Sequence, residues 1–250
     1  MVEAMRHAYA DRNAALGDPA FVENPVGRLL SADYAASVRA AIERDAAAPA
    51  APAPARERPE TTHYSVVDEA GNAVAVTYTV NGYFGAGVVA PGTGFFLNNE
   101  MDDFTAKPGT PNLSGLVQGE ANAIVPGKRP LSSMAPTLVE KDGKVVLVVG
   151  SPGGARIITT VLETIMNIVD YGMAPQAAVD APRLHFQGQP DKLFSERFGL
   201  SPDTAAILSG MGYKLVEQKP WGATELIEVA NGRLYGANDS RRPAGAAIGY

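Results

Sequence analysis

Alternating apolar and polar residues mark the part of the chain that follows Thr61. The stretches HYSVV and AVAVTYTV, at residues 63–67 and 73–80, have a period of two and flank the sequence DEAGN. Such alternation is typical of strands with one buried face, and a short polar stretch that contains glycine is typical of a turn between them. We therefore predict a β-hairpin over residues 63–80.

The same pattern predicts two further hairpins. The stretch APTLVEKDGKVVLVVG contains the pair Asp142-Gly143, and ELIEVANGRLYGA contains the pair Asn231-Gly232. Asp-Gly and Asn-Gly favour two-residue hairpin loops, because both positions of such a loop adopt positive φ angles. We expect each pair to join two antiparallel strands.

Helical spacing predicts two segments before Thr61. Residues 1–12 are rich in alanine and contain no helix breaker. Ser31 is a favourable N-cap for the sequence ADYAASVRAAIERDAA that follows it. In that sequence Tyr34, Val38 and Ile42 recur every four residues, which predicts one common face.

Two more helices are predicted after Thr61. Residues 151–172 change to helical spacing, and Gly172 suits a C-terminal stop. Residues 201–212 form a second capped helix, with Ser201 as N-cap and Pro202 at the first position. In the first of these helices we expect one buried face, made of Ile158, Leu162, Ile165 and Val169.

Strands therefore come in hairpins, and helices come in blocks of their own. This order predicts an α+β fold, with antiparallel sheet layered against helices rather than alternating βαβ units. Between the two parts, the sequence DAAAPAAPAPARERPE contains four prolines, which favour extended, solvated chain. We thus divide the chain into a helical segment at residues 1–45, a Pro/Ala-rich linker at 46–60 and a main part at 61–250.

Composition narrows the possible chemistry. The 250 residues are 46% hydrophobic and carry a formal net charge of -6, which argues against a nucleic-acid surface. The absence of cysteine excludes disulfides, thiolate nucleophiles and Cys-bound zinc, and His7, His63 and His185 are too far apart for a His-rich metal motif. No apolar run approaches the roughly 20 residues of a membrane span. The first residues have no signal-peptide pattern, so we expect the chain to begin inside folded structure.

Thr61 stands where the linker meets the first strand. A threonine hydroxyl is a weak nucleophile that needs an adjacent base, and a freed α-amino group on the same residue can supply one. An accessible linker that leads directly into Thr61 is what release of that amine requires. Threonine is also common in strands, so a purely structural interpretation of Thr61 stays open on pattern alone.

Two loops offer groups that bind charge. The sequence SPGG at residues 151–154 opens a predicted helix, so its backbone N–H groups suit an oxyanion or another anion, although it also fits an ordinary strand-to-helix turn. The loop NNEMDDF carries three carboxylates that suit an ammonium group or simply face solvent: Glu100, Asp102 and Asp103.

Hydroxyl and imidazole groups complete the candidates. Ser132 and Ser133, in PLSSMAP, suit a carboxylate, and loop polarity explains them equally well. His63 shares a strand face with Thr61, two residues away. A Thr–His pair is therefore one hypothesis, although no third orienting group is identifiable.

Several blocks resemble the γ-glutamyltransferase (γ-glutamyltranspeptidase) family of N-terminal-nucleophile hydrolases. The blocks that resemble its small subunit are TTHYSVVDEAGNAVAVTYTVNGYFGAGVV, LNNEMDDFTAKPG, RPLSSMAPTLV, GSPGGARIITTVLETIMNIVDYGM and GAAIGY, which run in the family's order from residue 61 to 250. The first 60 residues, notably YADRNAALGDPAFV, resemble the tail of the large subunit. The resemblance implies an αββα sandwich, incomplete because most of the large subunit would be absent.

The resemblance also implies roles for individual residues. Autocleavage between Glu60 and Thr61 would make Thr61 the nucleophile and the new N-terminus, with the Thr79 hydroxyl beside it. Three residues match those that hold the α-amino group of a γ-glutamyl substrate: Asn81, Glu100 and Asp103. Four more match those that contact its α-carboxylate or form the oxyanion hole, in that order: Ser132 and Ser133, then Gly153 and Gly154.

The implied reaction transfers a γ-glutamyl group from glutathione or a related compound to water, an amino acid or a dipeptide, with no metal or organic cofactor. The implied partners are these small molecules and a large-subunit segment, and the implied compartment is periplasmic or extracellular. Two alternatives stay open. One is a cephalosporin (glutaryl) acylase of the same fold, and the other is a non-catalytic fragment that needs a partner chain.

Two departures from the family accompany the resemblance. The family's large subunit supplies an arginine for the substrate α-carboxylate, and neither Arg12 nor Arg28 lies in a motif that matches it. The loop KPGTPNLSGLV resembles the lid over the site, but Ser114 stands where many bacterial relatives have an aromatic residue. A less closed lid with more water access is our hypothesis, and an unchanged hydrolysis-to-transfer ratio in Ser114→Tyr would contradict it.

Overall fold

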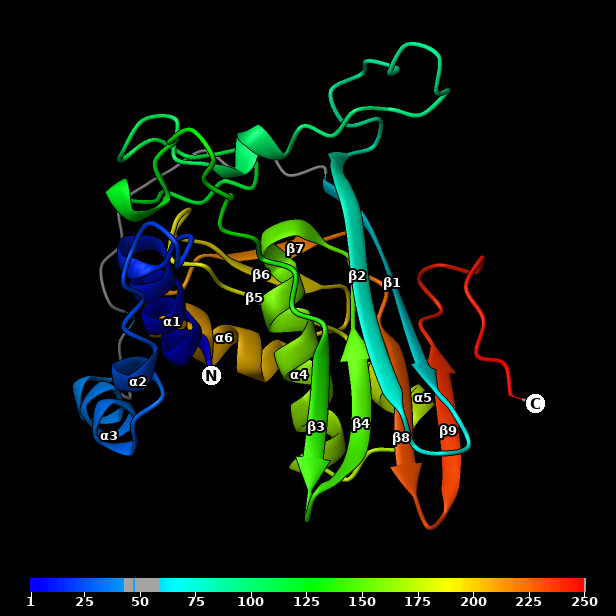
Figure 1. The fold of residues 1–250 in the computed structure, drawn as a ribbon. Helices are drawn as coiled ribbons and strands as arrows, with labels where there is room; N and C mark the ends of the chain where they lie inside the picture. The colour runs from blue at the N-terminus through cyan, green and yellow to red at the C-terminus, as the bar shows by residue number, and fades with distance from the viewer. Residues whose placement is uncertain (43–46, 48–58, 250) are drawn as a thin grey trace. The chain divides into compact units, whose positions relative to one another are not determined.

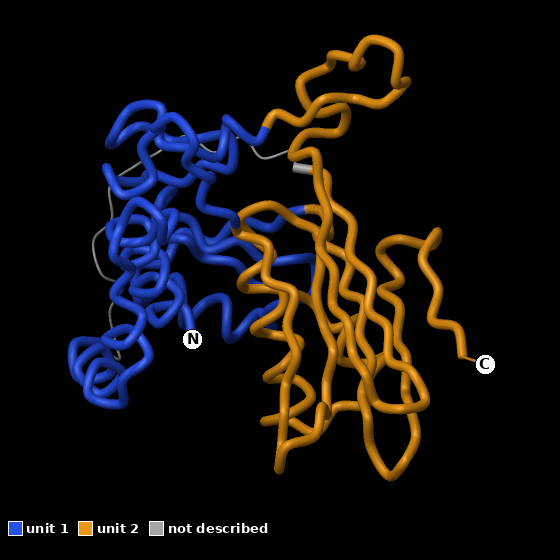
Figure 2. The backbone as a smooth tube through the Cα atoms, viewed as in Figure 1, with its two compact units in different colours: residues 1–57, 100–132, 184–218 blue, residues 58–99, 133–183, 219–250 orange. Residues whose placement is uncertain are grey.

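The structure is a computed structural model, and it describes residues 1–42, 47 and 59–249 (Figure 1). The predicted linker lies almost entirely outside the described residues. The chain forms two compact units, which we describe one at a time (Figure 2). Unit 1 comprises Met1–Glu57, Glu100–Ser132 and Leu184–Gln218, and unit 2 comprises Arg58–Asn99, Ser133–Arg183 and Lys219–Tyr250.

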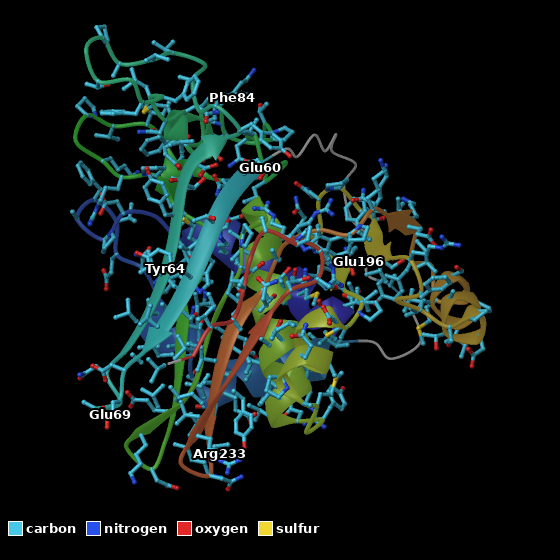
Figure 3. All side chains as sticks on the ribbon, turned by 90° about the vertical axis from the view of Figure 1, so that its right-hand side faces the viewer. Glu60, Tyr64, Glu69, Phe84, Glu196 and Arg233 are labelled. Atoms are coloured by element: carbon cyan, nitrogen blue, oxygen red, sulfur yellow. The ribbon has the colours of Figure 1, made fainter. Side chains whose placement is uncertain are left out.

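The predicted hairpin after the linker opens unit 2. Strands β1 (Pro59–Val67) and β2 (Ala73–Gly82) pair antiparallel, in continuous register from Thr61 to Val67. Their turn is closed by Asp68, whose Oδ1 accepts a hydrogen bond from the backbone N–H of Asn72 at 2.8 Å. In Figure 3, Glu60 and Glu69 lie near opposite ends of this hairpin.

The other two predicted hairpins join into one antiparallel sheet. Its order is β3 (Thr137–Lys141), β4 (Lys144–Gly150), β8 (Glu225–Ala230) and β9 (Arg233–Asn238). Both turn pairs have positive φ at both positions, 53° and 72° in the first and 52° and 70° in the second. The Asp-Gly and Asn-Gly turn chemistry thus acts as predicted.

Unit 2 is layered. The β1–β2 hairpin contacts one face of the four-stranded sheet, and helices α4 (Ile157–Val169) and α5 (Pro175–Asp180) contact the other (Figure 3). The core between sheet and helices is built from Leu147, Val149, Ile157, Val161, Val179, Leu226 and Ala237. This sheet-on-sheet arrangement with a helical layer agrees with the predicted α+β class.

The buried face of α4 differs from our prediction. Ile157 and Val161 are buried in the core, whereas Leu162 is 41% exposed and Val169 is 61% exposed. Ile165 does pack against the core. Apolar residues form two overlapping stripes along this helix, and the core takes the stripe that begins with Ile157 and Val161 rather than the predicted one.

Unit 1 is built mainly from short elements. It contains α1 (Val2–Ala15), α2 (Val26–Leu29), α3 (Ala32–Ala41), the 3₁₀ turns η1 (Glu100–Asp103) and η2 (Glu120–Asn122), and α6 (Pro202–Gly210). Ser31 and Ser201 cap α3 and α6 as predicted, each accepting a hydrogen bond from a backbone N–H three residues later. Met5 of α1 packs with Phe186 and Leu193 in the core of this unit.

One small sheet in unit 1 departs from the antiparallel pattern. Strand β6 (Leu193–Glu196) pairs antiparallel with β5 (Leu184–His185) but parallel with β7 (Leu215–Gln218). Helix α6 connects β6 to β7, which makes one βαβ unit. Two strands of four residues each carry too little periodicity to reveal this connection in the sequence.

Candidate active site

The hydroxyl groups of Thr61 and Thr79 meet across the β1–β2 hairpin. The two residues are directly opposite in the strand register. Thr61 Oγ1 donates to Thr79 Oγ1 at 3.2 Å, and Thr61 is buried, with 7% of its surface exposed. Directly opposed residues on one face of an antiparallel pair have neighbouring Cβ atoms, so the register itself places these hydroxyls together.

The Thr79 hydroxyl continues this contact to the peptide bond before Thr61. Thr79 Oγ1 donates to the carbonyl oxygen of Glu60 at 2.7 Å and accepts a hydrogen bond from the backbone N–H of Asn81 at 2.8 Å. The strand register shifts between Pro59 and Thr61, and Asn81 has a left-handed φ of 72°. Such irregularities re-aim groups at strand ends, and here they turn the Glu60 carbonyl toward a hydroxyl.

Arg242 brackets the same peptide bond. Its Nη1 donates to the carbonyl oxygen of Thr61 at 3.2 Å, and its Nη2 donates to Glu60 Oε2 at 2.9 Å. The preceding residue, Arg241, has a structural task, because it donates to the carboxylate of Asp239 and to backbone carbonyls at the end of α5. Asp239 is fully buried and also pairs with Arg183, which anchors the start of the segment that carries Arg242.

His63 does not pair with Thr61. Its Nδ1 bonds to Thr77 Oγ1 at 2.8 Å and its Nε2 bonds to Ser65 Oγ at 3.1 Å. Burial lowers the pKa of His63 to about 4, so the ring is neutral at physiological pH. The Thr–His hypothesis is therefore wrong in this structure.

The His63 ring instead fixes the hairpin on the sheet. It fills the space beside Gly150, where an added Cβ would lie only 2.2 Å from the His63 Cε1 atom. Gly150 is the last residue of β4 and precedes the SPGG sequence. This contact docks β1, which contains Thr61, against the strand that leads into the glycine turn.

The SPGG turn has the backbone of an anion site. Gly153 and Gly154 have φ angles of 139° and 57°, which glycine adopts readily because it has no Cβ. They precede and begin the 3₁₀ turn η3 (Gly154–Arg156), which is in contact with β1 and runs into α4. Ser151 braces the turn, since its Oγ donates to the carbonyl of Pro152 at 2.7 Å and accepts from the N–H of Ala223 at 3.1 Å.

In unit 1, Glu100 and Asp103 lie together on η1. Burial, and then repulsion by the charge of Asp103, raise the pKa of Glu100 to about 7. A carboxyl pair of this kind holds a proton that an arriving cation displaces. The third acidic residue of the loop, Asp102, is exposed on the same turn.

The remaining predicted positions are distributed over both units. Asn81, in unit 2, is buried and its Nδ2 donates to the carbonyl of Asn99 at 3.4 Å, one residue before Glu100. Ser132 is exposed at the end of a unit 1 segment, and Ser133 is half-buried at the start of the next unit 2 segment.

Ser114 is buried in unit 1, with its carbonyl 3.5 Å from the donating Nε2 of Gln187. A tyrosine at this position requires the loop to move.

Neither a metal site nor a membrane-spanning helix is present in the described residues. They contain no group of three or more His, Cys, Asp or Glu side chains placed to hold a metal ion. Within the same residues, no helix has the length and apolar character needed to cross a membrane.

Comparison with known proteins decides the family. The sequence model of the Gamma-glutamyltranspeptidase family matches residues 1–249. The chain belongs to this family. It is 55% identical over 263 residues to a glutathione hydrolase proenzyme of Pseudomonas sp. (strain A14), a match that covers 100% of the chain and 46% of that relative. The chain therefore spans less than half the length of this curated relative.

Solved structures of the gamma-glutamyltranspeptidase family share the fold. The T380A mutant of the Helicobacter pylori gamma-glutamyltranspeptidase matches with a TM-score of 0.71 and 55% identity, over 72% of this chain and 100% of that chain. The predicted family and α+β fold class are thereby confirmed. An acylase ACY 1 proenzyme of Pseudomonas sp. (strain SE83) is also similar, at 42% identity over 75% of this chain and 32% of that relative.

Arg242 contacts Thr61 and Glu60 in this member of the gamma-glutamyltranspeptidase family, and our sequence analysis did not predict it. Its partners, Glu60 and Thr61, are 182 and 181 positions away, so no local pattern links them. The only available signal was the Arg241-Arg242 pair itself, the densest basic group near the end of the chain.

Proposed function

We propose that this chain is the catalytic part of a γ-glutamyltransferase and glutathione hydrolase that activates itself by cutting the Glu60–Thr61 bond. The observation that carries the proposal is the hydroxyl chain from Thr61 Oγ1 through Thr79 Oγ1 to the Glu60 carbonyl oxygen. These contacts support the proposal, because self-cleavage requires a hydroxyl next to the peptide bond and a hydrogen-bond donor to its carbonyl oxygen.

Cleavage follows from this geometry in two steps. Thr61 Oγ1 bonds to the carbonyl carbon of Glu60, and the bond from that carbon to the Thr61 nitrogen breaks. The hydroxyl proton passes to that nitrogen, which leaves an ester and a free α-amine. Water then hydrolyses the ester to a Glu60 carboxylate and restores the Thr61 hydroxyl. Thr79 donates to the oxygen that gains negative charge, and Arg242 holds the flanking groups in register.

The freed amine makes Thr61 a catalytic nucleophile. With a reference pKa of about 7.7–8.0, it accepts the hydroxyl proton as Thr61 attacks the γ-carbonyl carbon of the donor. The donor amine leaves, a γ-glutamyl ester forms, and water or an acceptor amine from an amino acid or dipeptide then takes the acyl group. We assign the oxyanion to the N–H groups of Gly153 and Gly154.

The donor's charged end requires complementary groups. We assign its α-amino group to Asn81, Glu100 and Asp103, because an ammonium ion favours carboxylates. We assign its α-carboxylate to the hydroxyls of Ser132 and Ser133. Glutathione and other γ-glutamyl compounds are the proposed donors, and the two products of cleavage are proposed to remain one heterodimeric enzyme.

Intact mass measurement and N-terminal sequencing of the purified protein test the first step. We expect a product that begins Thr-Thr-His-Tyr, together with release of aniline from a γ-glutamyl anilide. Thr61→Ala is the control and is expected to stay uncut and inactive. A wild-type protein that remains uncut with Glu60 joined to Thr61 would contradict the proposal.

An acylase that removes glutaryl groups is the second candidate, because an acylase proenzyme is among the relatives. A glutaryl group lacks the α-amino group, so it leaves the carboxyl pair Glu100 and Asp103 without a cation. We therefore expect faster hydrolysis of γ-glutamyl anilide than of glutaryl anilide. The reverse preference would favour the acylase.

A further inference from the structure

The loop that carries Ser132 is held by the segment that precedes the proposed cut. Arg12, on α1, donates from Nη2 to the carbonyl oxygens of Leu131 and Ser132 at 3.3 and 3.2 Å. Asp18 holds the other end of this loop, because its carboxylate accepts hydrogen bonds from the backbone N–H and the guanidinium of Arg129 at 2.6–3.0 Å. Both contacts lie within unit 1.

The Arg12 contact fixes one particular peptide plane. The carbonyl of Ser132 belongs to the planar peptide that joins Ser132 to Ser133. A donor that holds this oxygen restricts the rotation of that plane and, with it, the directions in which the two hydroxyl-bearing Cβ atoms project. Arg12 thus influences Ser132 and Ser133, the two proposed carboxylate-binding residues, through the backbone peptide that joins them.

Arg12 is also buried, with only 7% of its surface exposed. Burial lowers the pKa of its guanidinium, while the neighbouring Tyr9 and Asp103 act in the opposite direction. A charged group is costly to bury unless hydrogen bonds and opposite charge compensate it. The compensating groups include Asn13, whose Oδ1 accepts a hydrogen bond from Arg12 at 3.2 Å, and Tyr9. They also include the Ser132 loop and Asp103, the two parts of unit 1 that we assign to the charged end of the γ-glutamyl substrate.

We propose that Arg12 is a positioning residue for donor binding, which sets the Ser132–Ser133 peptide and places a positive charge beside Asp103. The inference rests on the proposed function, since it needs a donor with an α-carboxylate and an α-amino group. It means that the polypeptide that ends at Glu60 after the cut continues to shape the substrate site. Arg12 itself contacts the loop and not the donor.

Kinetics with paired donors test the inference. Arg12→Met keeps an unbranched apolar side chain and removes the guanidinium, and Arg12→Lys keeps a charge without the planar fork. We measure kcat and KM for γ-glutamyl anilide and for 4-aminobutyryl anilide, which lacks the α-carboxylate. Titration of active sites corrects each value for protein that fails to fold or to process.

For Arg12→Met we expect KM for γ-glutamyl anilide to rise about tenfold, because the charged guanidinium no longer donates a hydrogen bond to the Ser132 loop. We expect kcat to change by less than about twofold, and the preference for the γ-glutamyl over the 4-aminobutyryl donor to fall about tenfold. Arg12→Lys should lie between Arg12→Met and wild type. Adding Arg12→Met to the Ser132→Ala/Ser133→Ala double variant should raise KM little further, because the arginine acts through these two serines.

Arg28→Met is the matched control. Arg28 lies in the same segment, is more exposed, and contacts Asp11 and the ring of Tyr34. Its loss should leave kcat and KM unchanged for both substrates. Equal losses for both donors in Arg12→Met, with KM unchanged, would show a structural role and overturn the inference alone. A wild-type protein that hydrolyses neither donor would instead overturn the proposed function, and the inference with it.

Discussion

At the scale of single residues, the proton positions around Thr79 follow from counting donors. A hydroxyl has one proton to donate and two lone pairs to accept with. The N–H of Asn81 must donate to Thr79 Oγ1, and a carbonyl oxygen such as that of Glu60 must accept. The single Thr79 proton therefore points at Glu60, and the Thr61 hydroxyl donates to Thr79. The arrangement directs one polarising bond to the proposed cleavage site.

Thr79→Val tests this direction. Valine keeps the branched shape and removes the hydroxyl, so the Glu60 carbonyl loses its donor. We expect self-cleavage to slow by about 10²–10³-fold, the usual cost of losing one such donor. Gel electrophoresis over time measures the rate. The matched control is Thr77→Val on the same strand face, whose hydroxyl bonds to His63 and which should cleave at nearly the wild-type rate.

The raised pKa of Glu100 predicts how activity depends on pH. Because burial and Asp103 raise its pKa to about 7, the carboxyl is protonated below that pH and ionised above it. A donor ammonium binds best to the ionised form, so kcat/KM for γ-glutamyl anilide should rise as pH increases through about 7. A free α-amine has a reference pKa of about 7.7–8.0, and the Thr61 amine would act on every substrate. We therefore measure the γ-glutamyl to glutaryl ratio, which cancels the amine.

In Glu100→Gln the rise of this ratio near pH 7 should disappear, because an amide does not titrate. The plateau should fall about tenfold with the loss of one charge-assisted contact. A ratio that keeps the same pH dependence in the variant would exclude Glu100 as the titrating group.

At the scale of elements, the absence of a side chain at Gly150 lets the β1–β2 hairpin pack against the four-stranded sheet. Gly150 leaves room for the His63 ring, and any side chain at this position collides with it. The docked hairpin carries Thr61 and Thr79, and the strand beneath it leads to Gly153. A contact between a histidine and a glycine 87 positions apart is thus one of those that hold the predicted hairpins together.

Gly150→Ala should therefore lower both stability and self-cleavage. The added methyl group overpacks the interface, and we expect the free energy of unfolding to fall by about 1–3 kcal/mol. Urea denaturation and the cleavage rate measure the two effects. Adding His63→Ala removes the obstructing ring and should restore part of both. Gly27→Ala, where an added Cβ meets no atom within 4 Å, is the control and should change neither.

At the scale of the whole molecule, the features that the sequence predicted correctly are those that depend on neighbouring residues. The three hairpins follow from turn pairs and alternation, and the register of the first then brings Thr61 opposite Thr79. The predicted buried face of α4 was wrong because its apolar residues form two overlapping stripes, and tertiary contacts select between them. The contacts of Arg12 and Arg242 span more than one hundred residues, so only folding reveals them.

The roles assigned to the other site residues rest on resemblance and stay predictions. Gly153, Gly154 and Asn81 have the unusual backbone that their roles would need, which sequence alone does not specify. Glu100 and Asp103 are adjacent in a way that the spacing of a 3₁₀ turn makes understandable, because residues three apart eclipse one another. The raised pKa of Glu100 depends on burial, and burial of a loop is a tertiary property.

The segment before Thr61 packs within unit 1. Met5 lies in the same core as Phe186, and the Asp18 carboxylate holds Arg129. Such contacts bury apolar surface and pair charges without using the Glu60–Thr61 bond. We therefore expect the two products of cleavage to co-elute in gel filtration at pH 7 and to separate only in concentrated guanidinium.

Met5→Ala should weaken this association, because it opens a cavity in the core that the two products share. Losses of about 2–5 kcal/mol are usual for such a change, enough for part of the smaller product to separate during gel filtration. Val26→Ala, at a position that is 50% exposed on α2, should leave the products together. If wild-type products separated without denaturant, the contacts of α1 would be too weak to hold Arg12 against its loop, and the donor site would have to form without it.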